Sequence, residues 1–217
     1  MIRKITNGGR KVIGKFPSQK MGRMVMWESQ IERDYIYLLE FDPEVISFEE
    51  QSVCVRYHDD RDSKIHRYTP DFLVTRVGNR VQVVEVKDDK TAKSDDCRQL
   101  FQRVAPVIYR EGYEFMVVTD SMIREQPLLD NVKLLQKYSM IPISDSHLLS
   151  LNDILSNREN MPFGEIVGLM GSRGFLKQEV FALLRHGILS LDLRKEINNT
   201  AIVTCLLNSM KCGEEKI

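Results

Sequence analysis

The chain has 217 residues, of which 42% are hydrophobic and 29% charged, and these proportions are typical of a globular protein with one large core or two small ones. No run approaches about 18 uninterrupted apolar residues, and the first residues lack an apolar signal core, so we expect neither a membrane span nor export. The four cysteines form no Cys-x-x-Cys pair, which favours free thiols in a reducing cytoplasm.

The charge of the chain is balanced overall but unevenly distributed. The 31 basic and 31 acidic residues cancel, which at first argues against a partner as acidic as DNA. Residues 1–24, however, contain several basic residues and no acidic one; they are Arg3, Lys4, Arg10, Lys11, Lys15, Lys20 and Arg23. With four glycines among them, they predict a flexible basic arm over 1–24 that contacts DNA phosphates. The alternative is a tail that only increases solubility.

The first regular element is a helix over 27–41. Apolar residues recur at helical spacing at Trp27, Ile31, Tyr35 and Leu38. Glu32 borders this apolar stripe, so a helix packed on a sheet could present its carboxylate to a metal site. A solvated helix charge is the alternative interpretation of Glu32. A turn follows, and then a strand over 46–53.

A hairpin of two strands, over 68–74 and 81–87, carries the candidate chemistry. Its strands alternate apolar and polar residues around a turn at Gly78 and Asn79. A hairpin of this length brings Asp71 near Glu85, and Lys87 lies two residues beyond Glu85 on the same face. Two carboxylates and an ammonium group suit Mg²⁺ binding and the activation of water against a phosphodiester. The alternative is an ordinary ion pair on the solvent face of a hairpin.

The chain then continues with a polar loop, a helix and a strand. Lys90 and Lys93 lie in the loop, where a solvated surface is a more ordinary role than a phosphate contact. The helix begins near residue 95 and is expected to bend or end at Pro106. Residues 114–119 form a continuous apolar run, which predicts a central strand.

The last third predicts a second, smaller domain. Breaking residues over 139–160 indicate a connection, and we place the boundary between residues 145 and 146. Helices over 162–169 and 176–186, followed by strands over 188–193 and 200–206, are typical of a winged helix. Because this segment is neutral, we expect it to dock a protein rather than to read bases.

Several ordered motifs resemble the TnsA family, the endonuclease subunits of heteromeric bacterial transposases. The motifs are Ser29-Gln-Ile-Glu32, Leu39-Glu-Phe-Asp-Pro-Glu-Val45, Glu49-Glu-Gln51, Pro70-Asp-Phe-Leu73 and Glu85-Val-Lys87. The resemblance covers roughly residues 20–140. It implies an α/β fold with a restriction-endonuclease-like core, a mixed central sheet flanked by helices over 25–145, and a winged-helix-like domain over 146–217.

The resemblance also implies site residues, a cofactor and partners. Glu32, Asp71, Glu85 and Lys87 match the catalytic set of the family. The three carboxylates would bind Mg²⁺, for which Mn²⁺ would substitute, and Gln51 would lie behind them. Lys87 would orient or deprotonate water, or stabilise the transition state. The enzyme would cut the 5′ strands of double-stranded transposon ends beside the bacterial nucleoid, with a TnsB-like transposase. A TnsC-like AAA+ ATPase would engage the carboxyl-terminal part.

Two other functions fit parts of the sequence. One is a stand-alone restriction or repair nuclease, which would cut DNA without partners. The other is an inert assembly adaptor that keeps only the fold. The basic reading helix that the first alternative needs is missing from the sequence, and the retention of all four site residues argues against the second.

Overall fold

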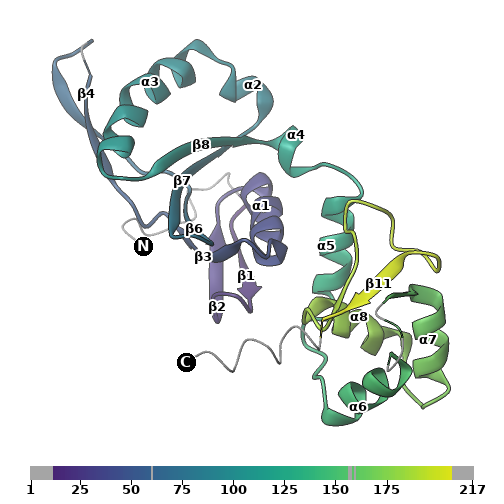
Figure 1. The fold of residues 1–217 in the computed structure, drawn as a ribbon. Helices are drawn as coiled ribbons and strands as arrows, with labels where there is room; N and C mark the ends of the chain where they lie inside the picture. The colour runs from purple at the N-terminus through teal and green to yellow at the C-terminus, as the bar shows by residue number, and fades with distance from the viewer. Residues whose placement is uncertain (1–11, 60, 156–157, 159, 207–217) are drawn as a thin grey trace. The chain divides into compact units, whose positions relative to one another are not determined.

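A computed structural model describes residues 12–59, 61–155, 158 and 160–206 of the chain (Figure 1). The chain divides into two compact units, Met1–Glu125 and Gln126–Ile217, which we describe separately. Within the described parts, no helix is both long enough and apolar enough to cross a membrane.

The N-terminal unit is built on a mixed sheet of four strands in the order β3-β6-β7-β8. Strands β3 (Val45–Glu50), β6 (Phe72–Arg76) and β7 (Arg80–Lys87) pair antiparallel, and β8 (Glu114–Thr119) pairs parallel to β7. The predicted hairpin is confirmed: Gly78 and Asn79 both have positive φ in the turn between β6 and β7. The predicted α/β fold, with a mixed central sheet flanked by helices, is therefore correct.

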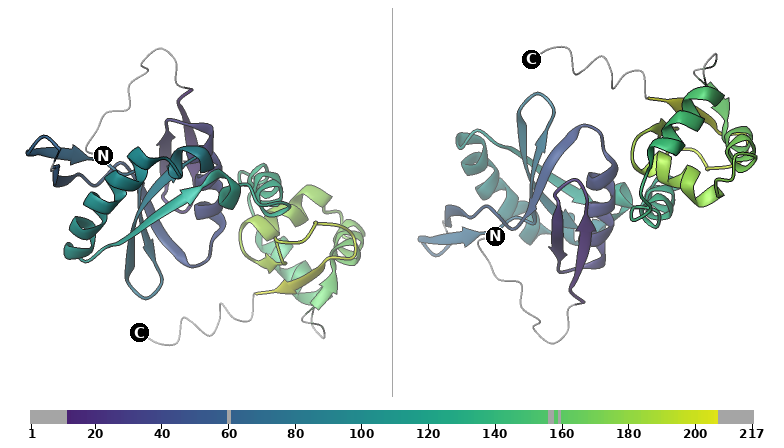
Figure 2. Two further views of the ribbon diagram at one scale, coloured as in Figure 1. Left: turned by 90° about the horizontal axis from the view of Figure 1, so that it is seen from above. Right: turned by 90° about the horizontal axis from the view of Figure 1, so that it is seen from below.

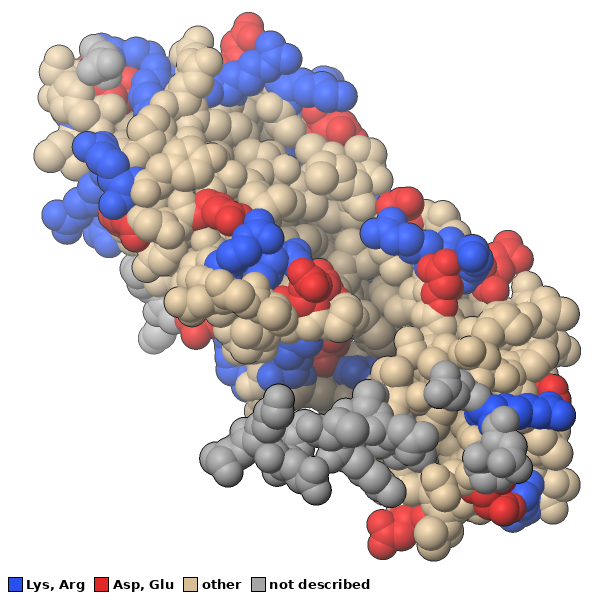
Figure 3. Space-filling model, viewed as in Figure 1, with Lys and Arg blue, Asp and Glu red and all other residues tan. Residues whose placement is uncertain are grey.

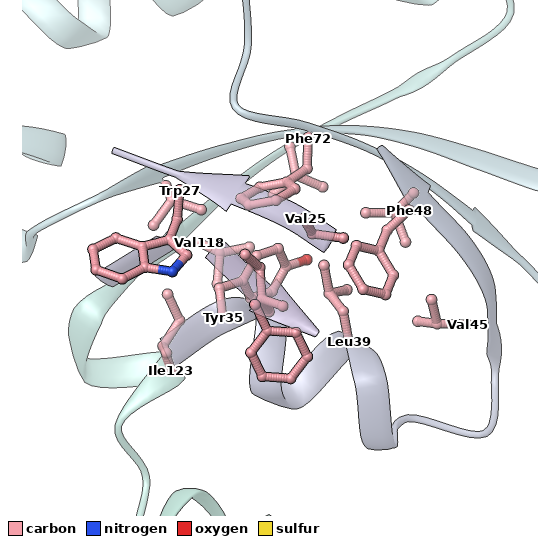
Figure 4. Close-up of a cluster of buried hydrophobic side chains, with 14 residues drawn as sticks. Val25, Trp27, Tyr35, Leu39, Val45, Phe48, Phe72, Val118 and Ile123 are labelled. Atoms are coloured by element: carbon pink, nitrogen blue, oxygen red, sulfur yellow. The ribbon is translucent and has the colours of Figure 1, made fainter. Parts of the chain in front are cut away.

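Helix α1 (Gln30–Phe41) covers one face of this sheet and forms the larger core. Its Tyr35 and Leu39 pack against Phe48 and Phe72 of the sheet (Figure 4). Ser29 begins the helix by accepting a hydrogen bond from the backbone N–H of Glu32. The apolar stripe predicted from the sequence is thus the buried face of α1.

Helix α3 (Asp95–Arg110) covers the opposite face (Figure 2). Its Val104 and Ile108 are fully buried against Val83 of β7 and the hairpin formed by β4 (Val55–Asp59) and β5 (Lys64–Tyr68). The helix does not end at Pro106 but continues to Arg110. Two short helices, α2 (Asp89–Ala92) and α4 (Asp120–Ile123), flank α3 and β8 in the chain.

The prediction of a flexible arm over 1–24 is wrong for its last residues. β1 (Gly14–Ser18) and β2 (Arg23–Trp27) form an antiparallel hairpin, and Phe16 and Val25 from this hairpin belong to the α1 core. Alternation of buried and exposed residues in β1 explains the error, because Lys15 takes an exposed position while Phe16 and Ser18 are buried.

The C-terminal unit starts earlier than the predicted boundary between 145 and 146. It contains the helices α5 (Leu128–Gln136), α6 (Asp145–Ile154), α7 (Phe163–Gly171) and α8 (Lys177–Arg185), and the strands β9 (Asn160–Pro162), β10 (Leu189–Ser190) and β11 (Ile202–Cys205). The strands pair antiparallel in the order β10-β11-β9. The boundary differs because α5 packs into this unit: the Asn131 amide donates to the carbonyls of Leu193 and Lys195 at 2.9 and 2.8 Å.

We predict that Phe16→Ala lowers the free energy of unfolding by about 3 kcal/mol, because Phe16 is 3% exposed and packs edge-on against Tyr37. Lys15→Ala, one residue earlier and exposed, should change it by less than about 0.5 kcal/mol. Urea unfolding of both variants measures the difference. If neither variant changes the free energy of unfolding, Phe16 does not stabilise the core and this segment behaves as part of the predicted flexible arm.

Candidate active site

The register between β6 and β7 brings Asp71 beside Glu85. Phe72 lies opposite Val84, so the residue before Phe72 faces the residue after Val84. The Asp71 carboxylate is held there by the backbone N–H of Val86, which donates to its Oδ2 at 2.7 Å. The predicted proximity of the two carboxylates is therefore confirmed.

Glu85 is buried rather than on a solvent face. It is 5% exposed, its Oε1 lies 2.5 Å from Nζ of Lys87, and its Oε2 accepts a hydrogen bond of 2.7 Å from the Tyr68 hydroxyl. A buried carboxylate with two charge-compensating partners is not the ordinary surface ion pair that the sequence left open. Tyr68 was not identified from the sequence, where only its position three residues before Asp71 connects it to the site.

Electrostatics ties the four predicted residues together. Burial, and then the charge of Glu85, raises the pKa of Asp71 to about 8. Glu32 acts in the same direction and Lys87 in the opposite one. Burial alone would lower the pKa of Lys87, but Glu85 and Asp71 outweigh it, so the net shift is upward. Lys87 thus offsets only part of the burial and repulsion, and Asp71 keeps its proton at neutral pH.

Glu32 lies in the first turn of α1, where it has a second role. Its two oxygens accept hydrogen bonds of 2.8 Å from the backbone N–H of Glu28 and the Ser29 hydroxyl. Burial raises the pKa of Glu32, and these two hydrogen bonds partly offset the effect. Glu32 therefore stabilises the start of α1 while it interacts electrostatically with Asp71 and Lys87.

Gln51 lies against the backbone of the site. Its N–H donates to the carbonyl of Asp71 at 2.9 Å, and its own φ of 46° is in the left-handed region. Its side chain is buried, and Oε1 has no hydrogen-bond partner among the described residues. The Gln51 backbone therefore holds the segment that carries Asp71, and a role for its side chain behind the carboxylates stays a prediction.

The predicted DNA-binding cations fall into three groups. Arg3, Lys4, Arg10 and Lys11 lie outside the described residues. Lys15 is exposed on β1. Lys20 and Arg23 have partners within the protein: Nζ of Lys20 donates to the carbonyls of Leu39 and Asp42 at the end of α1, and Arg23 forms a two-pronged ion pair with Glu50. DNA contact by these two side chains would compete with those bonds.

The donor set for a cation in this site is a carboxylate pair and not a three-carboxylate cluster. Among the described residues, no three His, Cys, Asp or Glu side chains are grouped closely enough to hold a metal ion. Mg²⁺, however, commonly uses one or two carboxylates together with water and substrate phosphate. Asp71 and Glu85 provide that donor set, and a cation would offset the burial and the carboxylate repulsion that together raise the pKa of Asp71.

A mixed sheet between two helical layers, with Asp71, Glu85 and Lys87 where β6 begins and β7 ends, defines a restriction-endonuclease-like domain. Comparison with protein families agrees: residues 42–120 match the family described as TnsA-like endonuclease N terminal. The match includes Gln51, Asp71, Glu85 and Lys87 but not Glu32, and it supports a TnsA-like endonuclease domain over the matched part of the N-terminal unit. A comparison with curated proteins found no match.

We predict that Asp71→Asn changes how stability depends on pH in metal-free protein. Between about pH 4 and 8 an unfolded Asp71 is ionised whereas the folded one holds its proton, so rising pH destabilises the folded state. Relative to the wild type, the variant should become more stable as pH rises, by at most about 1.4 kcal/mol per pH unit.

Urea unfolding in a chelator from pH 5 to 9 measures this slope. Glu111→Gln, at an exposed carboxylate that follows α3, is the matched control and should run parallel to the wild type. If the free energy of unfolding of Asp71→Asn also depends on pH as that of the wild type does, Asp71 is already ionised in the metal-free protein.

Proposed function

We propose that this protein is a Mg²⁺-dependent DNA endonuclease subunit of a cut-and-paste transposase. The observation that carries the proposal is the buried set of Asp71, Glu85 and Lys87, held by one strand register inside a TnsA-like endonuclease domain. Phosphodiester hydrolysis needs charge stabilisation and an oriented water, and these residues are suited to supply both.

Each site residue has a role that follows from its surroundings. Asp71 and Glu85 would hold Mg²⁺, which supplies Lewis acidity toward the phosphate and favours ionised water. Lys87 remains protonated because its pKa is raised, so we assign it to orienting water and stabilising negative charge on the phosphate, not to removing a proton. Tyr68 donates to Glu85 and keeps that carboxylate in one orientation. Glu32, which is bound to the start of α1, would contribute its negative charge or a water-mediated contact.

The transposase context rests on the family match and the sequence motifs. In this proposal the enzyme cuts the 5′ strands at transposon ends, while a TnsB-like transposase cuts and joins the 3′ strands. Dependence on partners agrees with a site whose carboxylates, once ionised, repel DNA phosphates until a cation binds. Arg3, Lys4, Arg10 and Lys11 would add phosphate contacts.

We also propose that the C-terminal unit is a winged-helix-like domain that docks a TnsC-like ATPase. Its chain order α6, β9, α7, α8, β10, β11, with β11 central in the sheet, supports this assignment. Residues 151–217 carry as many acidic as basic residues, which favours a protein partner over DNA.

We predict that Asp71→Ala lowers 5′-strand cleavage at least 100-fold, because it removes one of two candidate metal ligands. The measurement is strand-resolved cleavage of transposon-end DNA in Mg²⁺ with the partner transposase. Glu111→Ala, which removes an exposed carboxylate, should cut like the wild type.

If Asp71→Ala cuts the 5′ strand as fast as the wild type, Asp71 is not a catalytic residue. If the wild-type protein cuts as fast without the transposase, it is a stand-alone nuclease. If it never cuts in the presence of the transposase and Mg²⁺, it is an adaptor.

We predict that deleting residues 1–11 weakens DNA binding and lowers its log–log salt dependence by up to about 3.6, or about 0.9 for each of four lost cations. The deletion stops before β1, so the melting temperature should stay unchanged. Fluorescence anisotropy at several salt concentrations measures the slope, and an unchanged slope would leave these residues without a DNA role.

We predict that residues 1–125 alone fold but no longer bind the ATPase, because the described sheet and all four site residues lie within this unit. A pull-down of full-length and truncated protein against the ATPase tests the docking proposal. Equal capture of both would assign the docking surface to the N-terminal unit.

A further inference from the structure

The hairpin of β4 and β5 projects from the N-terminal unit as a two-stranded ribbon (Figures 1 and 2). Its residues alternate between two faces: Val55 and Tyr57 are buried in the α3 core, whereas Arg56 and His58 are exposed on the other face. From β5, Ile65 and Arg67 share that outer face, because they lie directly opposite His58 and Arg56. Figure 3 shows basic side chains over the end of the molecule that carries this ribbon.

Arg56 and Arg67 form a directly opposed pair of like charges. Such cross-strand pairs destabilise a hairpin unless something compensates them. Among the described residues, neither guanidinium forms an ion pair with a carboxylate; Nε of Arg67 instead donates to Sγ of Cys54 at 3.4 Å. The protein therefore keeps two adjacent positive charges on an exposed face at a cost to its own stability.

A second arginine pair in the same unit shows how the chain compensates such charges elsewhere. Arg76 and Arg80 are also directly opposed, across the β6–β7 hairpin. Arg76 is bound to Asp42 at 2.8 Å, and Arg80 to Glu114 at 3.0 Å. The contrast indicates that the outer face of the ribbon is open to an external anion.

The base of the ribbon is part of the active site. Tyr68, whose hydroxyl binds Glu85, is the last residue of β5 and directly follows Arg67. One strand residue spans about 3.3 Å, so the arginine pair begins within one residue of a side chain that holds a candidate metal ligand. Arg67 and Tyr68 point to opposite faces of the ribbon, so a duplex at the carboxylates lies beside the base of the ribbon and can reach its outer face by following the strand.

From these observations we propose that the outer face of the β4–β5 ribbon binds the phosphate backbone of the duplex beside the scissile bond, with Arg56 and Arg67 as its contacts. This inference rests on the proposed nuclease function. Planar guanidinium groups match phosphate oxygens in a two-pronged geometry, and a two-stranded ribbon fits the major groove. An acidic protein segment could satisfy the same charges, but the connection through Tyr68 to Glu85 favours the substrate.

The test is duplex binding by the full-length double variant Arg56→Ala/Arg67→Ala, measured by anisotropy with Ca²⁺ replacing Mg²⁺. Loss of two phosphate contacts should lower the log–log salt slope by about 1.8. Between about 50 and 200 mM salt, the wild-type advantage in affinity should shrink about 12-fold. The melting temperature should stay equal or rise, because the opposed charges are gone.

Two further variants separate charge from structure. Arg80→Ala removes an exposed arginine that is already paired with Glu114, and it should leave the salt slope unchanged. Arg56→Lys/Arg67→Lys keeps both charges without the planar fork, and it should restore most of the slope. A slope that the alanine pair lowers and the lysine pair restores is expected for phosphate contact, whereas a merely structural role for the two arginines leaves the slope unchanged in both double variants.

Failure of this inference and failure of the proposed function give different results. If the wild-type protein cuts DNA but the alanine pair binds with the same slope and affinity, the ribbon does not contact DNA and the nuclease proposal stands. If the wild-type protein shows no salt-dependent DNA binding and no cleavage, both proposals are overturned. If Arg56→Ala/Arg67→Ala binds DNA like the wild type but captures less of the ATPase, the ribbon binds a protein partner and the DNA inference is overturned.

Discussion

The pairing of β6 with β7 is the constraint on which the rest of the site depends. The side-chain period of a strand is two, so a slip of one residue would turn Glu85 and Lys87 to the opposite face of the sheet and separate them from Asp71. Val84 and Val86 are buried on the α1 face, and they oppose that slip because it would put the charged Glu85 and Lys87 into the apolar α1 core in their place. The apolar core and the reactive set are therefore specified by the same register.

The register brings together groups that repel each other, and the fold compensates only part of the repulsion. Lys87 and Tyr68 both bind Glu85, whereas Asp71 receives one backbone N–H and keeps a raised pKa. Complete compensation would leave a stable but inert salt-bridge network. Burial and carboxylate repulsion keep a proton on Asp71 in the metal-free protein, and a cation would displace that proton, so the electrostatic cost in the metal-free protein and the proposed activity have one cause.

Local patterns in the sequence predicted the elements that carry this register. Alternation around Gly78 and Asn79 gave the β6–β7 hairpin, and the helical stripe gave α1. The β1–β2 hairpin was missed because its basic residues and glycines resemble a flexible tail in sequence, while its contribution to the core depends on Phe16 reaching α1. Tyr68 and the helix-capping contacts of Glu32 also escaped prediction. Each depends on residues brought together by tertiary packing, and the periodicity of residues along the chain does not report such contacts.

The balanced net charge of the chain is a poor guide to its partners, because what matters is which charges are already satisfied. Arg23, Arg76 and Arg80 are each bound to a carboxylate of the same unit and add little to an external field. Arg56 and Arg67 have no such neighbour in the described structure. A single unpaired arginine would be unremarkable on any surface, but two that face each other across a ribbon oppose the stability of that ribbon. Carboxylates neutralise the opposed pair Arg76 and Arg80, whereas Arg56 and Arg67 stay exposed. We infer that the charge of the second pair binds an external anion.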